Sequence, residues 1–518
     1  MSWGRAAPAL VAIVAAGALL LSGGSGADPE TPAGLAGVPP PLLGVAVLGD
    51  GGLTAAVDAY GNVVDLRAPG PAGRALIENS AERQAAGTVP ADTGIQVWVR
   101  VGRGSALPMW EADSIRQRYL PGTNVLKTVA RFGAAEVELM QAAHGQVLAL
   151  VVSSDAGTQL RVNAAVRCEE RERRRGRTVT CWGGPAKGPR VPAAEVAAEA
   201  VLAGQRWLER SRWLDPSAPP WADRMYERSL LVLRALTDRR NGAVAAGARE
   251  GWAHVWPRDA GAVAIALAAA GHRPEAERIS RFLLGLDLEG AARFHGDGSP
   301  VPGRAAQGDA IGWVAAAAEA AGIIGSDRHA ARILSETYPV PWRERADYWE
   351  GEPGDFLANA IASLADVSEF SRHMWGENSD TPSIGLVREA DDAGSGLDSA
   401  AAWAVRPFSR LRLYPAVRAT LNRLVAQATP YGITPGEGWN GGGDPWSAPT
   451  AWTAWSLAAL GERRQALRLM QALRRSATPA GDLPERVDAE TGIPRSTTPL
   501  AWSHAFAVLA LRELWPSR

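Results

Sequence analysis

The spacing of apolar residues changes near residue 195, and this change constrains the fold more than any other feature of the sequence. Between about 43 and 165 the apolar residues form short runs, and every second residue of Ile95–Val101 is Ile or Val. A period of two is typical of half-buried β-strands. After 195, apolar residues recur at helical spacing, with no convincing strand between the segments. The sequence therefore predicts a strand-rich domain followed by an all-helical one.

A chain of 518 residues exceeds what one hydrophobic core usually holds, so two domains are expected. Short strands separated by glycine-rich turns predict an antiparallel β-sandwich over 43–193. A linker helix is predicted within 194–220, and about eleven helical segments follow over 221–518. Consecutive helices without strands are typical of an all-α (α/α)6-type toroid, in which hairpins alternate between an inner and an outer ring.

Polar and aromatic residues gather at the starts of alternate predicted helices. The clusters are Trp256–Asp259, Gln307–Asp309, Tyr348–Glu350, Leu397–Ser399, Asp444–Trp446, and Glu485 with Trp502–His504. In a ring of hairpins, alternate helices begin at the same end, so these clusters would converge on one cup. Helix N-termini also offer free N–H groups to oxygen-rich ligands. The sequence predicts a single polar site at one end of the inner ring.

The composition argues against nucleic acid as a partner, and its many tryptophans are compatible with a sugar ligand. Basic and acidic residues number 54 and 55, so the chain lacks the basic excess of a nucleic-acid-binding domain. The charged run 169–177 is interpreted as a solvated hairpin tip. There are 20 Trp against 7 Tyr and 7 Phe. Indole rings suit stacking on sugars, but they fill cores equally well, so their positions must decide.

The N-terminus indicates export. One basic residue, Arg5, precedes the apolar run Pro8–Leu21 and a stretch of small residues. This pattern over 1–27 predicts a signal peptide, or an uncleaved membrane anchor, followed by a flexible lead-in over 28–42. The protein is therefore expected to be secreted or anchored to the outer face of the cytoplasmic membrane.

The only two cysteines, Cys168 and Cys181, flank the charged hairpin tip. In an exported protein they could form a disulfide across a short loop, or they could be two buried thiols. Two cysteines without further ligands do not make a metal site, so no metal and no cofactor are predicted.

Several segments, in order, resemble glycoside hydrolase family 15, the glucoamylase family. Gly49–Gly61 is similar to the opening of its N-terminal β-domain, and Tyr119–Thr128 to that domain's Tyr…Thr-Asn-Val-Leu signature. Glu227–Asp238 resembles the first helix of its barrel. The resemblance runs from about 43 to 514 and implies a β-sandwich followed by an (α/α)6 barrel.

Trp256-Pro-Arg-Asp259 resembles the W-x-R-D motif of that family. The resemblance implies that Arg258 and Asp259 hold hydroxyls of the terminal glucose and that Trp256 lines the same site. A guanidinium and a carboxylate can fix neighbouring hydroxyls through charge-assisted hydrogen bonds. Taken without the other motifs, the pair would also fit a buried ion pair that caps a helix.

Asp347-Tyr-Trp-Glu350 is similar to the family's Trp-Glu motif. This makes Glu350 the expected general acid and Trp349 an expected substrate contact. A carboxyl group beside two aromatic rings would be partly desolvated, which raises its pKa and keeps it protonated. The residues after Glu350 depart from the family pattern and leave Glu352 as an alternative acid.

Asp482-Leu-Pro-Glu485 and Pro499–His504 match the family's "LPE…LaWSHA" ending, the most specific signature in the chain. Glu485 would be the general base that activates a water. The family inverts configuration, which implies carboxyl groups roughly 6.5–9.5 Å apart. Trp502 and His504 are expected to line the same pocket, with His504 equally suited to a supporting hydrogen bond.

Two further regions concern the aromatic residues near the site and the number of helices in the toroid. Trp446, together with Trp439, is similar to an aromatic segment of the family, and stacking on sugar or core packing would both suit it. Residues 373–396 are a short stretch rich in Gly and Asp where the family usually has another helix, so one helix of the toroid is expected to be shortened.

The resemblance implies an inverting, exo-acting α-glucosidase that releases terminal glucose from α-glucans or short α-gluco-oligosaccharides. A trehalase of the same family is one alternative, and a non-catalytic carbohydrate-binding protein of the cell surface is another. A phosphorolytic enzyme on a similar barrel would lack the general base, so Leu-Pro-Glu485 speaks against it. The expected partner is an α-glucoside, with membrane association only through the N-terminal segment.

Overall fold

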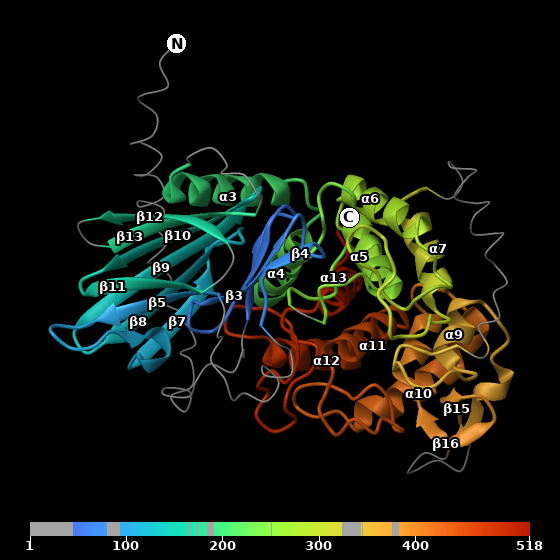
Figure 1. Ribbon diagram of the computed structural model, residues 1–518. Helices are drawn as coiled ribbons and strands as arrows, with labels where there is room; N and C mark the ends of the chain where they lie inside the picture. Colours follow the sequence, from blue (N-terminus) through green and yellow to red (C-terminus); the bar gives the residue numbers. More distant parts are fainter. Residues whose placement is uncertain are drawn as a thin grey trace. The chain divides into compact units, whose positions relative to one another are not determined.

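The computed structural model describes residues 45–79, 94–163, 166–173, 176–183, 191–249, 251–323, 343, 345–374 and 383–517. Two compact units divide these residues near Glu209. The first unit also takes in 234–236 and part of 248–251, and the second contains the remainder. Figure 1 shows the strands in the blue and teal part of the chain and most helices in the green to red part. The expected signal segment 1–27 and the lead-in 28–42 lie outside the described residues, and so does 327–338, which the helical spacing predicts as one of the eleven helical segments.

The first unit contains two antiparallel sheets. One has the order β1-β2-β3-β5-β11, with β4 on β3 and β6 on β5; the other has the order β12-β13-β10-β9-β8-β7. The strands of the first sheet are β1 (Ala46–Gly49), β2 (Thr54–Val57), β3 (Val63–Ala68), β4 (Arg74–Ile77), β5 (Gly94–Arg100), β6 (Leu107–Pro108) and β11 (Gly157–Asn163). Those of the second are β7 (Ser114–Tyr119), β8 (Leu126–Phe132), β9 (Ala135–His144), β10 (Val147–Ser154), β12 (Arg167–Arg173) and β13 (Gly176–Trp182).

The two sheets share one hydrophobic core, because each presents every second side chain to it. Strand β8 alternates buried and less buried residues along its whole length. Ile95 and Val97 of one sheet belong to the same buried cluster as Leu139 and Leu150 of the other. Helix α3 (Ala193–Leu208) covers the second sheet, where its Ala197 packs with Ala142 of β9. The alternation of the sequence thus becomes an antiparallel sheet region with a helix on one face.

A disulfide joins Cys168 and Cys181, which are direct partners on the paired strands β12 and β13. The described residues of the charged run, 169–173 and 176–177, lie on these two strands. Arg171 and Glu169 form an ion pair at 3.0 Å on β12.

The second unit is mainly helical. Its helices are α4 (Pro220–Ala235, shared with the first unit), α5 (Pro257–Ala269), α6 (Arg273–Leu284), α7 (Ala310–Ala320), α9 (Leu357–Ala362), α10 (Tyr414–Ala426), α11 (Ser447–Ala459), α12 (Arg463–Ser476) and α13 (Ala501–Leu514), with a longer 3₁₀ helix η5 (Ser399–Ala404). Among the described residues, no helix is both long enough and apolar enough to cross a membrane.

Buried and amphipathic helices alternate along this unit. Helices α5, α11 and α13 are buried on every side over most of their length, and their sequences are rich in Ala. Helices α6 and α12 are amphipathic, with apolar residues on the buried face and charged residues, Arg and Glu in α6 and Arg in α12, on the other. A helix that is apolar all round needs neighbours on all sides, whereas an amphipathic helix needs only one.

The buried helices contact one another in a closed series. The contacts run from α5 to α7, α9, η5, α11 and α13, and α13 contacts α5 again. All but α9, which begins seven residues after Glu350, begin next to one of the polar clusters noted in the sequence, such as Arg258 at α5 and Asp398 at η5. The polar clusters therefore stand at the starts of helices that are neighbours in space.

The expectation that no strand interrupts the helices is wrong in one place. Residues read as a glycine-rich loop form a three-stranded antiparallel sheet, β14 (Ser371–Met374), β15 (Ser383–Glu389) and β16 (Asp392–Leu397). The preceding helix α9 is short, because the chain turns at Leu364, which has a positive φ of 60°. Glycines at 385, 394 and 396 weaken any helix that could follow, and β15 buries Leu386 and Val387 instead.

The disulfide is expected to stabilise the first unit. Its cysteines are 13 residues apart in sequence, and a cross-link that closes a loop of this size removes about 3 kcal/mol of chain entropy from the unfolded state. Replacing both cysteines with Ser should lower the free energy of unfolding of this unit by about that amount. Urea titration followed by far-ultraviolet circular dichroism measures it, with reduced wild-type protein as the matched comparison. An unchanged midpoint would contradict the prediction.

Candidate active site

Arg258, at the start of α5, occupies the centre of the polar cluster. Its side chain is almost fully buried, with Nη1 at 2.8 Å from Gln307 Oε1 and 3.2 Å from Asp309 Oδ2. Its Nη2 lies 3.3 Å from Asp259 Oδ2, and its guanidinium carbon lies 4.7 Å from the centre of the Trp502 ring. A planar guanidinium with donors in several directions can bind several acceptors at once.

Asp259 carries a strongly shifted proton affinity. Burial raises its pKa to about 7 against the opposing charge of Arg258, and the nearby carboxylates of Asp309 and Glu485 raise it further. The influence of Glu485 places these two carboxyl groups in the same electrostatic neighbourhood, although they are far apart in sequence.

Gln307 connects Arg258 to Glu350. Its Nε2 donates to the carbonyl of Asp347 at 3.1 Å and to Glu350 Oε1 at 3.4 Å, while its Oε1 accepts from Arg258. Trp256 Nε1 also donates to Glu350 Oε1, at 2.9 Å, and Arg304 forms an ion pair with Oε2. Three donors therefore surround one carboxyl group.

Glu350 has an unusual backbone conformation. Its φ of 58° lies in the left-handed region, which costs a residue with a side chain roughly 1–2 kcal/mol. The Glu350 N–H donates to the carbonyl of Asp347 at 3.0 Å and closes a turn. This turn directs the Glu350 carboxyl toward Trp256 and Arg304. Glu352, the alternative acid, is exposed two residues further on.

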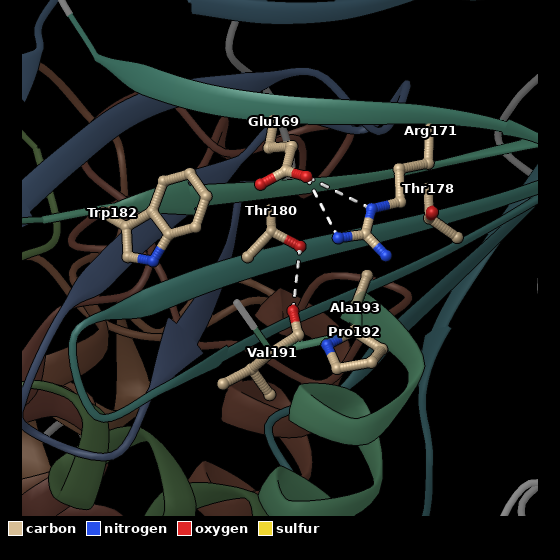
Figure 2. A pocket seen from close by; sticks show the side chains of 8 residues that line it. All are labelled: Glu169, Arg171, Thr178, Thr180, Trp182, Val191, Pro192 and Ala193. Atoms are coloured by element: carbon tan, nitrogen blue, oxygen red, sulfur yellow. Dashed lines mark hydrogen bonds and ion pairs between the residues drawn. The ribbon is translucent and has the colours of Figure 1, made fainter. Parts of the chain in front are cut away.

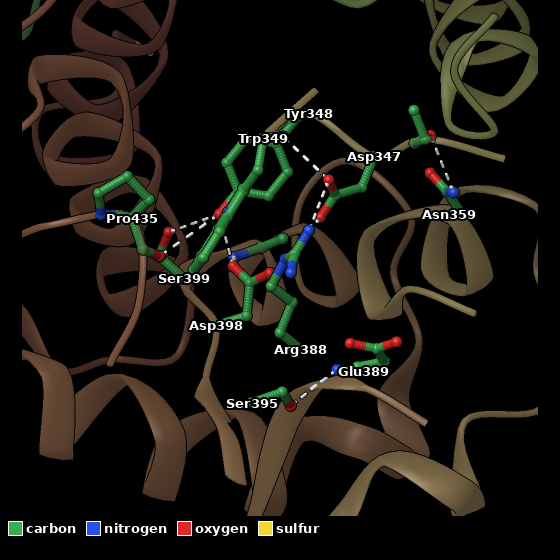
Figure 3. Close-up of polar contacts among 12 residues, drawn as sticks. Asp347, Tyr348, Trp349, Asn359, Arg388, Glu389, Ser395, Asp398, Ser399 and Pro435 are labelled. Atoms are coloured by element: carbon green, nitrogen blue, oxygen red, sulfur yellow. Dashed lines mark hydrogen bonds and ion pairs between the residues drawn. The ribbon is translucent and has the colours of Figure 1, made fainter. Parts of the chain in front are cut away.

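A clamp formed by Asp347 and Arg388 holds this turn from the other side (Figure 3). Arg388, on β15, donates from Nε to Asp347 Oδ2 at 2.9 Å and from Nη2 to Oδ1 at 3.0 Å. Its guanidinium also lies 4.2 Å from the ring centre of Trp349 and 4.3 Å from that of Phe356. Tyr348, which lies between Asp347 and Trp349 in the sequence, donates a hydrogen bond from its hydroxyl to Asp398 at 2.5 Å. The unexpected sheet thus supplies the counter-charge for the segment that carries Glu350.

Glu485 lies on a loop that several hydrogen bonds fix. Its N–H donates to the carbonyl of Thr497 at 2.9 Å, and its carbonyl accepts from Ser447 N at the start of α11. Its carboxyl group accepts from Trp252 Nε1 at 3.3 Å and from the hydroxyl of Ser496. Burial raises the pKa of Glu485, and these two donors and the charges of Arg486 and Arg304 oppose the rise.

Arg304 is therefore near both predicted catalytic carboxyl groups. It forms an ion pair with Glu350. The charge of Glu485 raises the pKa of Arg304, and the charge of Arg304 lowers the pKa of Glu485. A second route joins the same two groups, from Glu350 through Gln307, Arg258 and Asp259 to Glu485. The two glutamates belong to a single polar cluster within the second unit.

His504, for which the sequence left a substrate contact and a supporting hydrogen bond equally open, makes supporting hydrogen bonds in the structure. It is fully buried, and its Nε2 accepts from Leu483 N at 2.9 Å, so its proton is on Nδ1, 2.9 Å from Ser229 Oγ. Burial lowers the pKa of His504 well below its usual value and keeps the ring neutral. With both nitrogens engaged, the imidazole positions the loop two residues before Glu485.

Three of the tryptophans form an edge-to-face series. The ring centres of Trp349 and Trp439 are 5.1 Å apart, and those of Trp439 and Trp446 are 5.2 Å apart. All three are half-buried, and their indole N–H groups have no hydrogen-bond partner among the described residues. Trp502 is more deeply buried and lies against Arg258. The series therefore presents aromatic surface next to Glu350, whereas Trp502 packs against Arg258.

Sequence reasoning missed four contributors to the site, namely Trp252, Arg304, Arg388 and Ser496. Each is an isolated residue outside the recognised motifs, although Trp252, Arg304 and Ser496 lie within three or four residues of a motif or polar cluster. Their common property is a contact with Glu350, Glu485 or the turn that carries Glu350, which no local pattern reveals.

Elsewhere, a pocket in the first unit lies where β12 and β13 meet the start of α3 (Figure 2). The ion pair of Glu169 and Arg171 and the side chain of Trp182 line it, and no predicted site residue does. In the described part of the chain, no group of three or more His, Cys, Asp or Glu side chains is arranged to hold a metal ion.

The clamp is expected to stabilise the second unit. Asp347 is fully buried, so replacing Arg388 with Met would leave it without its main counter-charge and should lower the free energy of unfolding by about 3 kcal/mol. Arg388→Lys should lose less, and adding Asp347→Asn to Arg388→Met should recover part of the loss. Arg281→Met, at an exposed pair with Glu277, should change stability by only about 0.5 kcal/mol. Denaturant titration of the set measures these differences; equal losses for the Arg388 and Arg281 variants would contradict the clamp.

No protein-family model and no curated protein sequence matches the chain. Among solved structures, a bacterial glucoamylase complexed with acarbose matches at a TM-score of 0.67 and 13% identity, over 95% of this chain and 96% of the other. A wild-type glycosidase matches at a TM-score of 0.48 and 20% identity, over 57% and 97%. A glucoamylase from Saccharomycopsis fibuligera matches at a TM-score of 0.46 and 13% identity, over 58% and 97%. The resemblance to glycoside hydrolase family 15 is thus confirmed at the level of the fold: along nearly its whole length, this chain has the fold of a bacterial glucoamylase.

Proposed function

We propose that this chain is an inverting glycoside hydrolase that releases terminal glucose from α-glucosides, with Glu350 as general acid and Glu485 as general base. The observation that carries the proposal is that Glu350 pairs with Arg304 and accepts from Gln307, a partner of Arg258, while Glu485 lies within electrostatic range of Arg304 and Asp259. Two carboxyl groups that flank a glycosidic bond are the minimum equipment of such an enzyme. The shared fold with a bacterial glucoamylase supports the same reading.

The closed series of buried helices supports an (α/α)6 toroid as the scaffold. Its inner ring would consist of α5, α7, α9, η5, α11 and α13, with amphipathic helices such as α6 and α12 outside. Because the inner helices start beside the polar clusters, the cup would lie at that end of the ring. The residues after η5 and the sheet β14–β16 would form the part of the wall of the cup that differs from the family pattern.

Arg258 and Asp259 would fix the hydroxyls of the terminal glucose. Both lie in the cluster with Glu485, and Asp259 can accept a hydrogen bond from a sugar hydroxyl when its carboxyl group is ionised. The series Trp349, Trp439 and Trp446 would pack against sugar rings. Trp256 would hold Glu350 in place through its N–H.

The reaction would follow from these positions. Glu485 takes a proton from a water, whose oxygen bonds to C1 on the face opposite the leaving group. As the bond between C1 and the glycosidic oxygen breaks, Glu350 gives its proton to that oxygen. The products are glucose of inverted anomeric configuration and an alcohol. Exchange with solvent then returns the proton to Glu350 and removes one from Glu485.

The substrate would be an oligosaccharide or a related α-glucoside, which accords with the acarbose complex of the bacterial glucoamylase. Linkage depends on the part of the site that holds the second sugar, so α-1,4, α-1,6 and trehalose remain the candidates to compare. Secretion or anchoring through 1–27 stays a prediction of the sequence.

A substrate screen tests the proposal directly. Purified protein should release glucose from at least one of maltose, maltotriose, isomaltose and trehalose, and proton NMR of the first turnovers should detect β-glucose before mutarotation. Retention of the α-anomer would contradict the inverting mechanism. Binding of these sugars without any glucose release would instead favour a carbohydrate-binding protein.

The two glutamates should respond differently to substitution. Glu485→Gln should lower kcat by about 10²–10⁴-fold on every substrate and leave sugar affinity largely intact, since a base is needed whatever the leaving group. Glu350→Gln should lower kcat by a similar factor on maltose but far less on α-glucosyl fluoride, whose leaving group needs little protonation. Glu352→Gln is the matched control and should retain wild-type rates. If Glu485→Gln rather than Glu350→Gln spared the fluoride, the two roles would be exchanged.

A further inference from the structure

The carboxyl group of Glu437 attaches a loop of the second unit to the sheet β14–β16. Its Oε2 accepts from Nη2 of Arg372, on β14, at 2.9 Å and from the backbone N–H of Leu397, on β16, at 3.3 Å. Its Oε1 accepts from Gln427 at 3.1 Å and from Arg423, near the end of α10, at 3.4 Å. One carboxyl group therefore joins the loop to the sheet through one oxygen and to the region of α10 through the other.

The sheet and α10 also support each other directly. Figure 1 shows β15 and β16 beside α10, and the N–H of Leu386, on β15, donates to Thr420 Oγ1 of α10 at 2.8 Å. Burial acts to raise the pKa of Glu437, but the hydrogen bonds from Leu397 and Arg372 outweigh it and leave the pKa below its usual value. The attachment is thus an ionic one, made between side chains that are mostly shielded from water.

The loop and β16 also touch through their backbones. The N–H of Glu437 donates to the carbonyl of Leu397 at 2.9 Å. A Cβ at Gly438 would lie 2.1 Å from the carbonyl oxygen of Ser395, and one at Gly436 would lie 2.6 Å from that of Leu397. Only glycine allows so close an approach of two backbones. The two glycines therefore belong to the same attachment as the ion pair.

This loop carries Trp439, the middle ring of the aromatic series. Its ring centre lies 5.1 Å from that of Trp349 and 5.2 Å from that of Trp446. Trp349 directly precedes Glu350, and the residue after Trp446 donates its N–H to the carbonyl of Glu485 at 2.9 Å. The series therefore extends from the segment of one proposed catalytic glutamate to the segment of the other.

The same sheet holds the neighbouring ring of the series. Arg388 binds the carboxylate of Asp347, and its guanidinium lies 4.2 Å from the ring centre of Trp349. Arg388 and Arg372 stand on β15 and β14, which pair with each other. The contact between Trp349 and Trp439 is thus fixed from one sheet on both sides. Because an edge-to-face contact depends on the distance and angle of its rings, the sheet sets the shape of this aromatic surface.

We propose that Arg372 is a positioning residue for the aromatic series: through Glu437 it holds the loop of Trp439 in place, so that the sugar on the leaving-group side meets a fixed surface. The inference rests on the proposed hydrolase function. It concerns the leaving-group side because Trp349 adjoins Glu350, which must reach the glycosidic oxygen. Arg372 itself binds Glu437 and a backbone carbonyl of β16, so its influence on a sugar is indirect.

The test compares a disaccharide with α-glucosyl fluoride, which has no second sugar. In Arg372→Met, we expect KM to rise about tenfold for the disaccharide that the wild type cleaves fastest, because a small misplacement of a binding surface is costly. Its kcat/KM for the fluoride should stay within about twofold of the wild-type value, since the reacting groups are untouched. Arg372→Lys should recover part of the loss. Arg418→Met, at an exposed ion pair between α10 and Glu462, is the matched control and should change neither substrate.

A second variant breaks the same attachment without removing a charge. Gly438→Ala should raise KM for the disaccharide and spare the fluoride, because the new methyl group would push the loop away from Ser395. Adding Glu437→Gln to Arg372→Met should cost little more than Arg372→Met alone, since the two side chains act as one unit. Equal losses on the disaccharide and the fluoride would indicate general damage to the fold and overturn the inference. An unchanged KM in both Arg372→Met and Gly438→Ala would overturn it as well.

Binding separates failure of this inference from failure of the hydrolase proposal. Calorimetry on Glu485→Gln measures the affinities for glucose and maltotriose, and adding Arg372→Met should weaken maltotriose by about tenfold and leave glucose unchanged. This result would support the positioning role even if no glucoside were hydrolysed. Hydrolysis by the wild type, together with equal maltotriose affinity in the two variants, would leave the enzyme standing and end the positioning role. No binding of maltotriose to Glu485→Gln would also overturn it.

Discussion

The guanidinium of Arg258 is almost completely removed from water, and the arrangement of the second unit has to compensate for that. Desolvation of such a charge costs several kcal/mol unless acceptors surround it. Here Asp259 comes from the same helix, Asp309 and Gln307 come from the start of α7, and Trp502 of α13 covers one face of the guanidinium. Three neighbouring helices are thus held by their N-terminal ends around one cation. The residues that would act on a sugar extend from these same ends.

Glu350 shows how such a framework can hold a side chain in an unfavourable conformation. Its left-handed backbone persists because the turn from Asp347 is fixed on both sides, by Gln307 within the cluster and by Arg388 from the sheet behind it. Residues kept in sparsely populated backbone regions tend to mark functional sites, since the surrounding contacts must offset the strain. The same contacts also leave Glu350 beside Arg304.

The tryptophans divide into two groups that the composition alone could not separate. Trp313, Trp403 and Trp452 are fully buried and contact one another edge to face in the centre of the helical unit. Trp252, Trp349, Trp439 and Trp446 are half-buried, and two of them contact groups of the candidate site. Large rings therefore serve both as the packing between helices and as the surface next to the glutamates, and exposure is what distinguishes the two uses.

The sequence by itself determined the features that depend on local spacing. Alternation in β8 and helical periodicity in α5 to α13 follow from which side chains must be buried, and the clusters around Arg258, Glu350 and Glu485 were visible because a motif occupies consecutive positions. Only the tertiary structure decided what approaches from elsewhere in the chain. The sheet β14–β16 replaced an expected loop, Arg388 and Arg304 reached the segment of Glu350, and His504 proved to be a buried support. The physical reason is that a pattern along the chain records burial, whereas charge pairing is set by distances in space that sequence separation does not encode.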